Sequence, residues 1–129
     1  MSGSPTSRSL EYLRGMGYKA GVVERFIQAI HQRVDLFGCI DIVAIREHVQ
    51  GVLGVQSTTA DNEAARVTKA VSLPALRTWL EAGNVFEVHG WSLKGARGKR
   101  KTWALNIIPI FIQDGDGELV IGEIQEGEI

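Results

Sequence analysis

The sequence predicts an α/β fold in which a central mixed sheet is flanked by helices. Runs rich in Val, Ile and Leu, separated by turn residues, indicate strands, and segments with apolar residues at helical spacing lie between them. In chain order these segments give α-β-β-β-α-β over about residues 7–110. A length of 129 residues with 22% charged side chains fits one globular domain of this kind.

The first elements are a leader, a short helix and a strand. Residues 1–7 are mostly Ser, Gly and Pro without periodicity, which predicts a disordered leader before a single domain over residues 8–124. Leucines at helical spacing predict a helix over about residues 7–15 that stops at a glycine. Residues 18–30 suit a helix by apolar spacing and a strand by β-branched content, and we favour a strand beginning near Val22.

A β-hairpin follows, and it carries the chemistry. Residues 39–46 and 51–58 are both rich in Val, Ile and Leu and are joined by a polar run. With a four-residue loop, antiparallel pairing places Asp41 opposite Gln56. Directly opposed side chains lie on one face of the sheet with β-carbons ~5 Å apart. Thr58, two residues further along, shares that face.

Asp41 is unusual because its strand is apolar on both faces. A carboxylate is rarely buried unless it is paired, protonated or bound to a metal. Hydrogen bonds from Gln56 and Thr58 would satisfy Asp41 without any function, so a structural role and a metal-binding role both remain open.

The remaining segments predict two helices and three strands. Apolar spacing and turn residues give a helix starting at Thr59 or Asp61, a helix over about residues 73–83, strands over about residues 85–91 and 103–112, and an edge strand over residues 119–124. In the strand over residues 85–91, alternation predicts that Glu87 and His89 point outward. The Asp-Gly pairs in residues 114–117 are typical of a hairpin turn.

Cysteine content and hydropathy favour a cytoplasmic protein. Cys39 is the single cysteine, so an internal disulfide and a multi-cysteine metal site are both excluded. Because apolar runs stay well below the ~20 residues of a membrane span, we expect no membrane partner.

Charge is distributed unevenly along the chain. Residues 113–129 hold six acidic side chains and no Lys or Arg, and we expect residues 125–129 to form a frayed acidic tail. Residues 1–112 hold all 14 basic side chains and nine acidic ones, a net charge of +5. A mildly basic body of this kind is compatible with DNA binding.

The most basic stretch of the chain lies between the last two long strands. Five cations separated by glycines form what we call the basic tip: Lys94, Arg97, Lys99, Arg100 and Lys101. A hairpin tip of this composition suits non-specific contact with phosphates, and Trp91 and Trp103 beside it would stack on bases if exposed. The alternative is a solvated loop flanked by two core tryptophans.

The hairpin also has a family resemblance. Gly38, Asp41 and residues 42–44 follow the pattern Gly-x-x-Asp-apolar-apolar-Ala, and a turn and an apolar strand come next. This arrangement resembles the active-site hairpin of PD-(D/E)XK nucleases, which include Holliday-junction resolvases. In that superfamily the second strand ends in Glu-x-Lys, whereas residues 56–58 here are Gln-Ser-Thr.

The resemblance implies a restriction-endonuclease-like core and a metal-dependent DNA endonuclease, working as a homodimer and, in resolvase-like members, on branched DNA. The implied cofactor is Mg²⁺ or Mn²⁺, held by Asp41, Gln56 and the backbone carbonyl of Ser57. In this reading Thr58 would hydrogen-bond the attacking water. The alternative is a catalytically inactive nuclease-fold module for DNA binding or protein interaction.

Two further site residues follow from the resemblance. Related nucleases often carry an acid near the start of the strand that precedes the hairpin, and Glu24 is the candidate here, with Glu11 second. Some members have moved the catalytic lysine to the helix after the hairpin. Lys69 would fill that role here, with Arg66 as the other candidate.

Overall fold

A computed structural model describes residues 3–128 of the chain. The helices are α1 (Pro5–Gly15), α2 (Ala60–Val71) and α3 (Pro74–Glu81), with a short 3-10 helix η1 (Gln28–Ile30). The strands are β1 (Lys19–Val22), β2 (Arg25–Ile27), β3 (Gln32–Val34), β4 (Ile42–Ile45), β5 (Leu53–Thr59), β6 (Val85–Lys94), β7 (Thr102–Ile112), β8 (Leu119–Ile121) and β9 (Gln125–Glu126). Within residues 3–128, no helix has the length and apolar character needed to cross a membrane.

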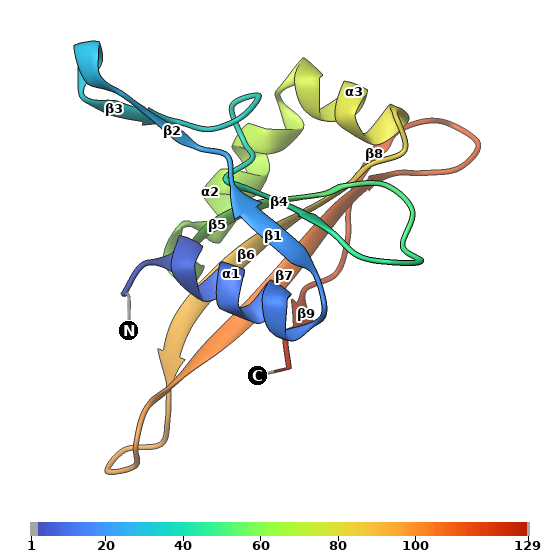
Figure 1. The fold of residues 1–129 in the computed structure, drawn as a ribbon. Helices are drawn as coiled ribbons and strands as arrows, with labels where there is room; N and C mark the ends of the chain where they lie inside the picture. The colour runs from blue at the N-terminus through green and yellow to red at the C-terminus, as the bar shows by residue number, and fades with distance from the viewer. Residues whose placement is uncertain (1–2, 129) are drawn as a thin grey trace.

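The main sheet has the order β1-β4-β5-β6-β7-β8, and β9 pairs with β7 (Figure 1). Strands β5 and β6 are parallel, and the other neighbours in the sheet are antiparallel. A parallel pair needs a crossover connection, which α2 and α3 supply. The predicted α/β class with a mixed sheet and flanking helices is therefore confirmed.

The hairpin of β4 and β5 has the predicted register. Val43 pairs with Gly54, and the backbone N–H of Asp41 donates to the carbonyl of Val55 at 2.8 Å, so Asp41 lies opposite Gln56. The loop is longer than four residues because the strand pairing stops at Ala44. Its glycine, Gly51, has φ +85° and packs directly against the Gly83 carbonyl, where a β-carbon would not fit.

Two cores hold the helices on opposite faces of the sheet. On one face, Val67 of α2 and Leu76 of α3 cluster with Phe86, Val88 and other side chains of β6 and β7. On the other face, Leu13 of α1 packs on β4 and β5. Each large apolar side chain buried in this way stabilises the fold by roughly 1.5–3 kcal/mol. Val43 of β4 and Gly54 of β5 face α3. Residues two apart in a strand share a face, so Asp41, directly before β4, and Gln56 of β5 also lie on the face covered by α2 and α3.

The strand predicted to begin near Val22 instead ends there. Val22 pairs with Ile42, and the chain then leaves the main sheet as a separate two-stranded arm formed by β2, η1 and β3 (Figure 1). The β-branched content of residues 18–30 therefore reflects two short strands rather than one. The apolar spacing in the arm leaves Phe26 and Ile30 exposed.

Both ends of the chain are more ordered than predicted. Helix α1 begins at Pro5, and the Ser4 hydroxyl caps it by accepting a hydrogen bond from the Ser7 N–H at 3.1 Å. At the other end, Gln125 and Glu126 form β9, so an acidic side-chain composition did not prevent backbone pairing. Residues 1, 2 and 129 of the predicted leader and tail lie outside the described residues.

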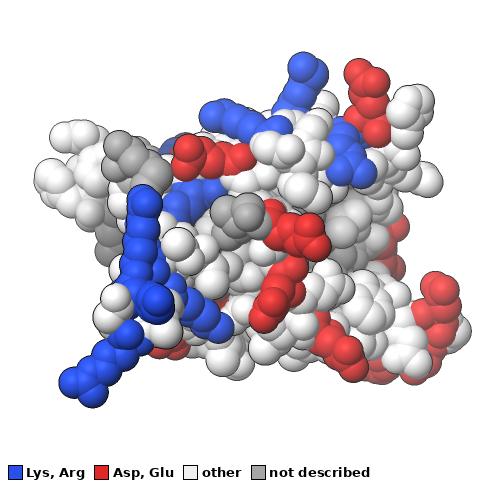
Figure 2. All heavy atoms as spheres, turned by 90° about the horizontal axis from the view of Figure 1, so that it is seen from below, with Lys and Arg blue, Asp and Glu red and all other residues white. Residues whose placement is uncertain are grey.

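The hairpin of β6 and β7 projects from the body, and its end carries the basic tip (Figure 1). All five cations of the tip are exposed. Figure 2 looks at the end of the molecule from which this hairpin projects. It shows one group of Lys and Arg side chains at the left, and further Lys and Arg side chains along the top that lie among Asp and Glu side chains. More Asp and Glu side chains lie over the centre and right of this view.

Candidate metal centre

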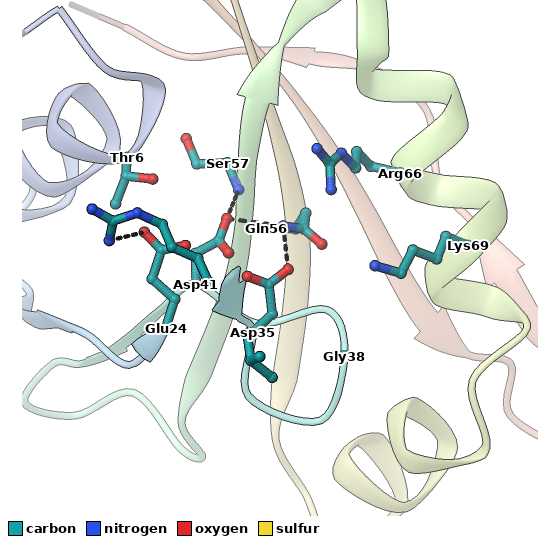
Figure 3. A pocket seen from close by; sticks show the side chains of 11 residues that line it. Thr6, Glu24, Asp35, Gly38, Asp41, Gln56, Ser57, Arg66 and Lys69 are labelled. Atoms are coloured by element: carbon teal, nitrogen blue, oxygen red, sulfur yellow. Dashed lines mark hydrogen bonds and ion pairs between the residues drawn. The ribbon is translucent and has the colours of Figure 1, made fainter. Parts of the chain in front are cut away.

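Three carboxylates converge where β4 begins. One oxygen from each of Glu24, Asp35 and Asp41 lies within 4.8 Å of the others (Figure 3). The three residues are spread over 18 positions of the sequence. A tight turn, the pairing of β2 with β3 and a backbone hydrogen bond to the start of β4 bring them together.

A tight turn places Asp35 beside Asp41. Leu36 and Ile40 exchange backbone hydrogen bonds of 2.9 and 3.0 Å, and Phe37 and Gly38 between them have φ of +54° and +82°. Two consecutive residues with positive φ match the mirror-image turns that close tight hairpins. Asp35 and Asp41 are the next residues outward on the two sides of this turn.

The arm brings in Glu24. Arg25 pairs with Val34 across β2 and β3, so Glu24 and Asp35 are the residues flanking that pair at the base of the arm. The backbone N–H of Val23 donates to the Asp41 carbonyl at 2.8 Å, which ties this base to the start of β4. The Arg33 guanidinium lies 3.8 Å from the Glu24 carboxylate.

Gln56 joins two of the acids. Its Nε2 donates to Asp41 Oδ2 at 2.9 Å and to Asp35 Oδ2 at 3.2 Å, and the Ser57 N–H donates to Asp41 Oδ2 at 2.8 Å. The other end of the amide, Oε1, is buried without a hydrogen-bond partner among the described residues. A buried amide oxygen without a donor is costly, and it needs an explanation such as a bound water or ion.

The crowding of carboxylates changes the acidity of Asp41. The pKa of Asp41 is raised from an ordinary 3.8 to about 8. Burial is the largest cause, and the hydrogen bond and the negative charge of Asp35 contribute to the same rise. The hydrogen bonds from Ser57 and Gln56 act in the opposite direction. At neutral pH the pair Asp35 and Asp41 therefore holds a proton, which a divalent cation would displace.

A cavity of about 400 Å³ opens onto the acids. The three carboxylates and Arg33 line one side, and the side chains of Arg66 and Lys69 reach in from α2 on the other (Figure 3). Lys69 is exposed and Arg66 is half-buried. Acidic and basic walls facing each other can hold a cation and an anion side by side.

Six of the residues predicted for the site lie around this cavity. They are Glu24, Asp41, Gln56, Ser57, Arg66 and Lys69. Thr58 shares the face of Asp41 and Gln56 as predicted, but it is buried and does not line the cavity. Glu11, the other candidate acid, lines a different cavity beside α1. The basic tip also lies outside the cavity.

Sequence reasoning underestimated Asp35. From the sequence, Asp35 could be a further acid behind the site, but an aspartate before an apolar pair is more typical of a turn cap, and we favoured that reading. The signal for its place beside Asp41 is the mirrored order around Gly38, in which two apolar residues and then an aspartate stand on each side. Thr6 and Arg33, which also line the cavity, carry no comparable sequence signal.

The prediction that His89 points to solvent is wrong. His89 is fully buried on the α1 face of the sheet, where its Nδ1 lies 2.9 Å from Ser9 Oγ and its Nε2 lies 2.8 Å from Glu87 Oε1. Ser9 Oγ also lies 2.8 Å from Ser57 Oγ and accepts a hydrogen bond from Trp91 Nε1 at 2.9 Å. This chain of contacts, which we call the serine–histidine network, anchors α1 to the sheet.

The chain matched nothing in comparisons with protein-family models, with curated proteins and with solved structures.

Proposed function

We propose that the protein is a metal-dependent DNA endonuclease that hydrolyses phosphodiester bonds. One arrangement carries the proposal: clustered carboxylates and a buried amide oxygen without a donor share one cavity with two cationic side chains. The same cavity offers oxygen ligands for a hard divalent cation and cations for a phosphate. By its resemblance, the chain would act as a homodimer, with branched DNA as the resolvase-like substrate.

The proposed ligands are all oxygens. Asp35, Asp41 and Glu24 each supply a carboxylate, and Gln56 supplies Oε1 once its amide turns over. In its present orientation the amide donates Nε2 to two carboxylates. A cation between those carboxylates would repel the N–H groups and attract the oxygen. The Ser57 carbonyl remains the predicted fifth protein ligand, with water completing the set, and Mg²⁺ or Mn²⁺ fits such a set.

Each part of the cavity has a role in hydrolysis. A divalent cation would lower the pKa of a water and offset charge on the scissile phosphate. Arg66 and Lys69 would hold the phosphate from the opposite wall, and Lys69 would orient the attacking water in place of the strand lysine. The water oxygen then bonds to phosphorus, the phosphorus–oxygen bond to the leaving strand breaks, and that strand takes up a proton.

A second function is favoured by a different observation. Gln56 and Ser57 both hydrogen-bond Asp41, and Thr58 does not line the cavity. An Asp41 carboxyl held by protein groups in this way would suit a nuclease-fold module that binds DNA, or another protein, without cleaving it. The basic tip would then carry the DNA contact.

Cleavage assays on plasmid DNA and on a synthetic four-way junction distinguish these functions. We expect cleavage with Mg²⁺ or Mn²⁺ and none in chelator. Asp41→Asn should lower the rate at least ~100-fold because it removes a carboxylate that would hold the cation, and Lys69→Gln should lower it about 100-fold because it removes positive charge that faces the reacting phosphate. Lys19→Gln, which removes an exposed lysine of β1 outside this cavity, serves as the matched control.

The outcome also ranks the alternatives. Salt-sensitive DNA binding without cleavage in either metal would contradict the endonuclease and support the binding module. Absence of both binding and cleavage at modest salt would leave a protein-interaction module.

A further inference from the structure

A second cavity, of about 460 Å³, lies on the α1 face of the sheet, between α1 and the hairpin of β6 and β7. Its walls are mostly aromatic or apolar and include Tyr12, Met16, Trp91 and Trp103, with Arg8 and Glu11 also lining it. We call it the aromatic cavity. Its volume is within the range of small-ligand pockets.

Arg8 is the unusual residue of this cavity. Its guanidinium lies 3.4 Å above the centre of the Trp103 ring, and the residue is only 7% exposed. Its Nε is buried without a hydrogen-bond partner among the described residues. A buried guanidinium stacked on an indole in this way holds the ring in place by a cation–π contact and adds positive charge beside it.

The two tryptophans have different roles. Trp91 is buried, and its Nε1 donates a hydrogen bond to Ser9 Oγ, so its ring contributes only apolar surface to the cavity wall. Trp103 is half-buried, so part of its ring surface is open to a ligand. Trp103 is therefore the stacking surface, whereas Trp91, which would stack only if exposed, belongs to the core.

The basic tip adjoins this cavity. Trp103 pairs with Leu93, and the next pair outward is Lys94 with Thr102, so the stacking surface lies at the base of the tip. A strand whose phosphates contact the tip has its bases within reach of Trp103. The occupant must thus be both polyanionic and aromatic, which describes a nucleic-acid strand.

Helix α1 also links this cavity to the candidate metal centre. Thr6 lines the acidic cavity and Arg8 lines the aromatic one, two residues apart on the same helix. The N-terminal turns of α1 therefore contribute to both cavities.

We propose that the aromatic cavity binds an unpaired base of a DNA strand, stacked on the Trp103 ring that Arg8 holds in place, while the basic tip holds the neighbouring phosphates. This inference rests on the proposed function and names its substrate class: DNA with an unpaired strand near the cleavage point. A base inside a duplex is already stacked on both faces and does not enter such a cavity without being extruded.

Binding without cleavage tests the inference independently of the nuclease activity. In the Asp41→Asn protein and in chelator, fluorescence anisotropy gives the Kd of a labelled 12-nucleotide single strand and of the same strand with three central abasic sites. We expect the intact strand to bind at least about tenfold more tightly. Trp103→Ala should remove that difference and leave the Kd of the abasic strand within about twofold.

Further variants separate stacking from folding and from charge. Trp103→Phe keeps a ring and should retain most of the preference for the intact strand, and Arg8→Gln should reduce it. Lys99→Gln should weaken both strands equally, and Lys19→Gln should change neither. Circular dichroism checks that each variant is folded, and if Trp103→Ala is not, the comparison of Arg8→Gln with the unsubstituted residue decides.

Equal binding of intact and abasic strands by the Asp41→Asn protein would overturn the inference. So would a preference that persists in Trp103→Ala or, where that variant is unfolded, in Arg8→Gln. Cleavage with no dependence on bases would remove this site alone, whereas base-dependent binding with no cleavage by the wild type would remove the endonuclease alone.

Discussion

Strand β5 contributes to two buried polar clusters, one on each face of the sheet. In one cluster the polar groups are paired by hydrogen bonds, and in the other carboxylates are crowded together. On the α1 face, the serine–histidine network gives both ring nitrogens of His89 a partner and surrounds Ser9 Oγ with three. On the other face, Asp35 and Asp41 crowd two like charges, and Gln56 leaves an amide oxygen without a partner. Ser57 belongs to both clusters, by its side chain on one face and its backbone N–H on the other.

The contrast separates structural polarity from candidate function. A closed hydrogen-bond network returns most of the cost of burying its groups, so it strengthens the attachment of α1. In the acidic cluster, which opens onto a cavity, the desolvation of the carboxylates is not offset in this way, and the pKa of Asp41 is raised. A strongly raised pKa in a cavity is typical of a functional site. Three predictions test this contrast, and the largest effect comes first.

Removing His89 should destabilise the protein most. His89→Ala deletes a fully buried ring, removes one of the three partners of Ser9 Oγ and the hydrogen bond to Glu87 Oε1, and removes the edge contact to Tyr12 at a centroid distance of 5.9 Å. We expect a loss of about 3 kcal/mol in the free energy of unfolding, measured by urea denaturation.

His31→Asn is the matched control for that variant. His31 is exposed in the arm and has φ +50°, a conformation that Asn also adopts. Its substitution should change the unfolding free energy by less than about 0.5 kcal/mol. A similar loss from both variants would mean that the network has no special structural role.

Divalent metal should stabilise the acidic cluster by an intermediate amount. At a concentration 100 times its Kd, Mg²⁺ or Mn²⁺ would add about 2.7 kcal/mol, seen as a rise of several degrees in Tm. The rise should be larger at pH 8 than at pH 6, because metal competes with the proton retained by Asp41 up to about pH 8. Asp41→Asn should abolish it, and an unchanged Tm shift in that variant would place the metal elsewhere.

The smallest change should follow Asp41→Asn in the absence of metal. The asparagine oxygen can accept the hydrogen bonds from Gln56 and Ser57, and its amide can donate to Asp35. At pH 6 we expect the unfolding free energy to change by less than about 1 kcal/mol. An equal and large loss in Asp41→Asn and His89→Ala would erase the contrast between the clusters.

The same variant tests the sign of the pH dependence. The folded protein keeps the Asp41 proton to about pH 8, whereas the unfolded chain releases it near pH 3.8. The stability from this group is therefore fully present below about pH 3.8 and is lost as the pH rises towards 8. Asp41→Asn should flatten the fall in stability over that range, as measured by urea denaturation at several pH values.

The sequence was sufficient for the hairpin but not for the full site. Two apolar runs joined by a polar run predicted the pairing of Asp41 with Gln56, and this register is present although the loop is longer than the four residues assumed. Glu24 was a candidate only through the resemblance, and its approach to Asp35 depends on the register of the arm, whose strands are only three residues each. Strands that short leave almost no periodic signal.

The predictions for His89 and for the acidic tail were wrong for a shared reason, because both took polar side chains as a sign of solvent exposure. Alternation predicted His89 outward because it treats a polar residue as solvated, yet a polar face can be buried when its hydrogen bonds are satisfied by a helix such as α1. The tail was expected to fray because it is acidic, but backbone pairing with β7 is insensitive to side-chain charge, and Gly127 fits closely against Leu105.

Cys39 lies in the turn that joins Asp35 to Asp41, and this position makes it an internal reporter. Its thiol is 1% exposed, and burial is the main cause that raises the pKa of Cys39 to about 11. Thiol reagents act on the exposed thiolate, so they can modify this residue only when the turn opens. The labelling rate of this one sulfur thus measures how often the two aspartates separate, with no substitution needed.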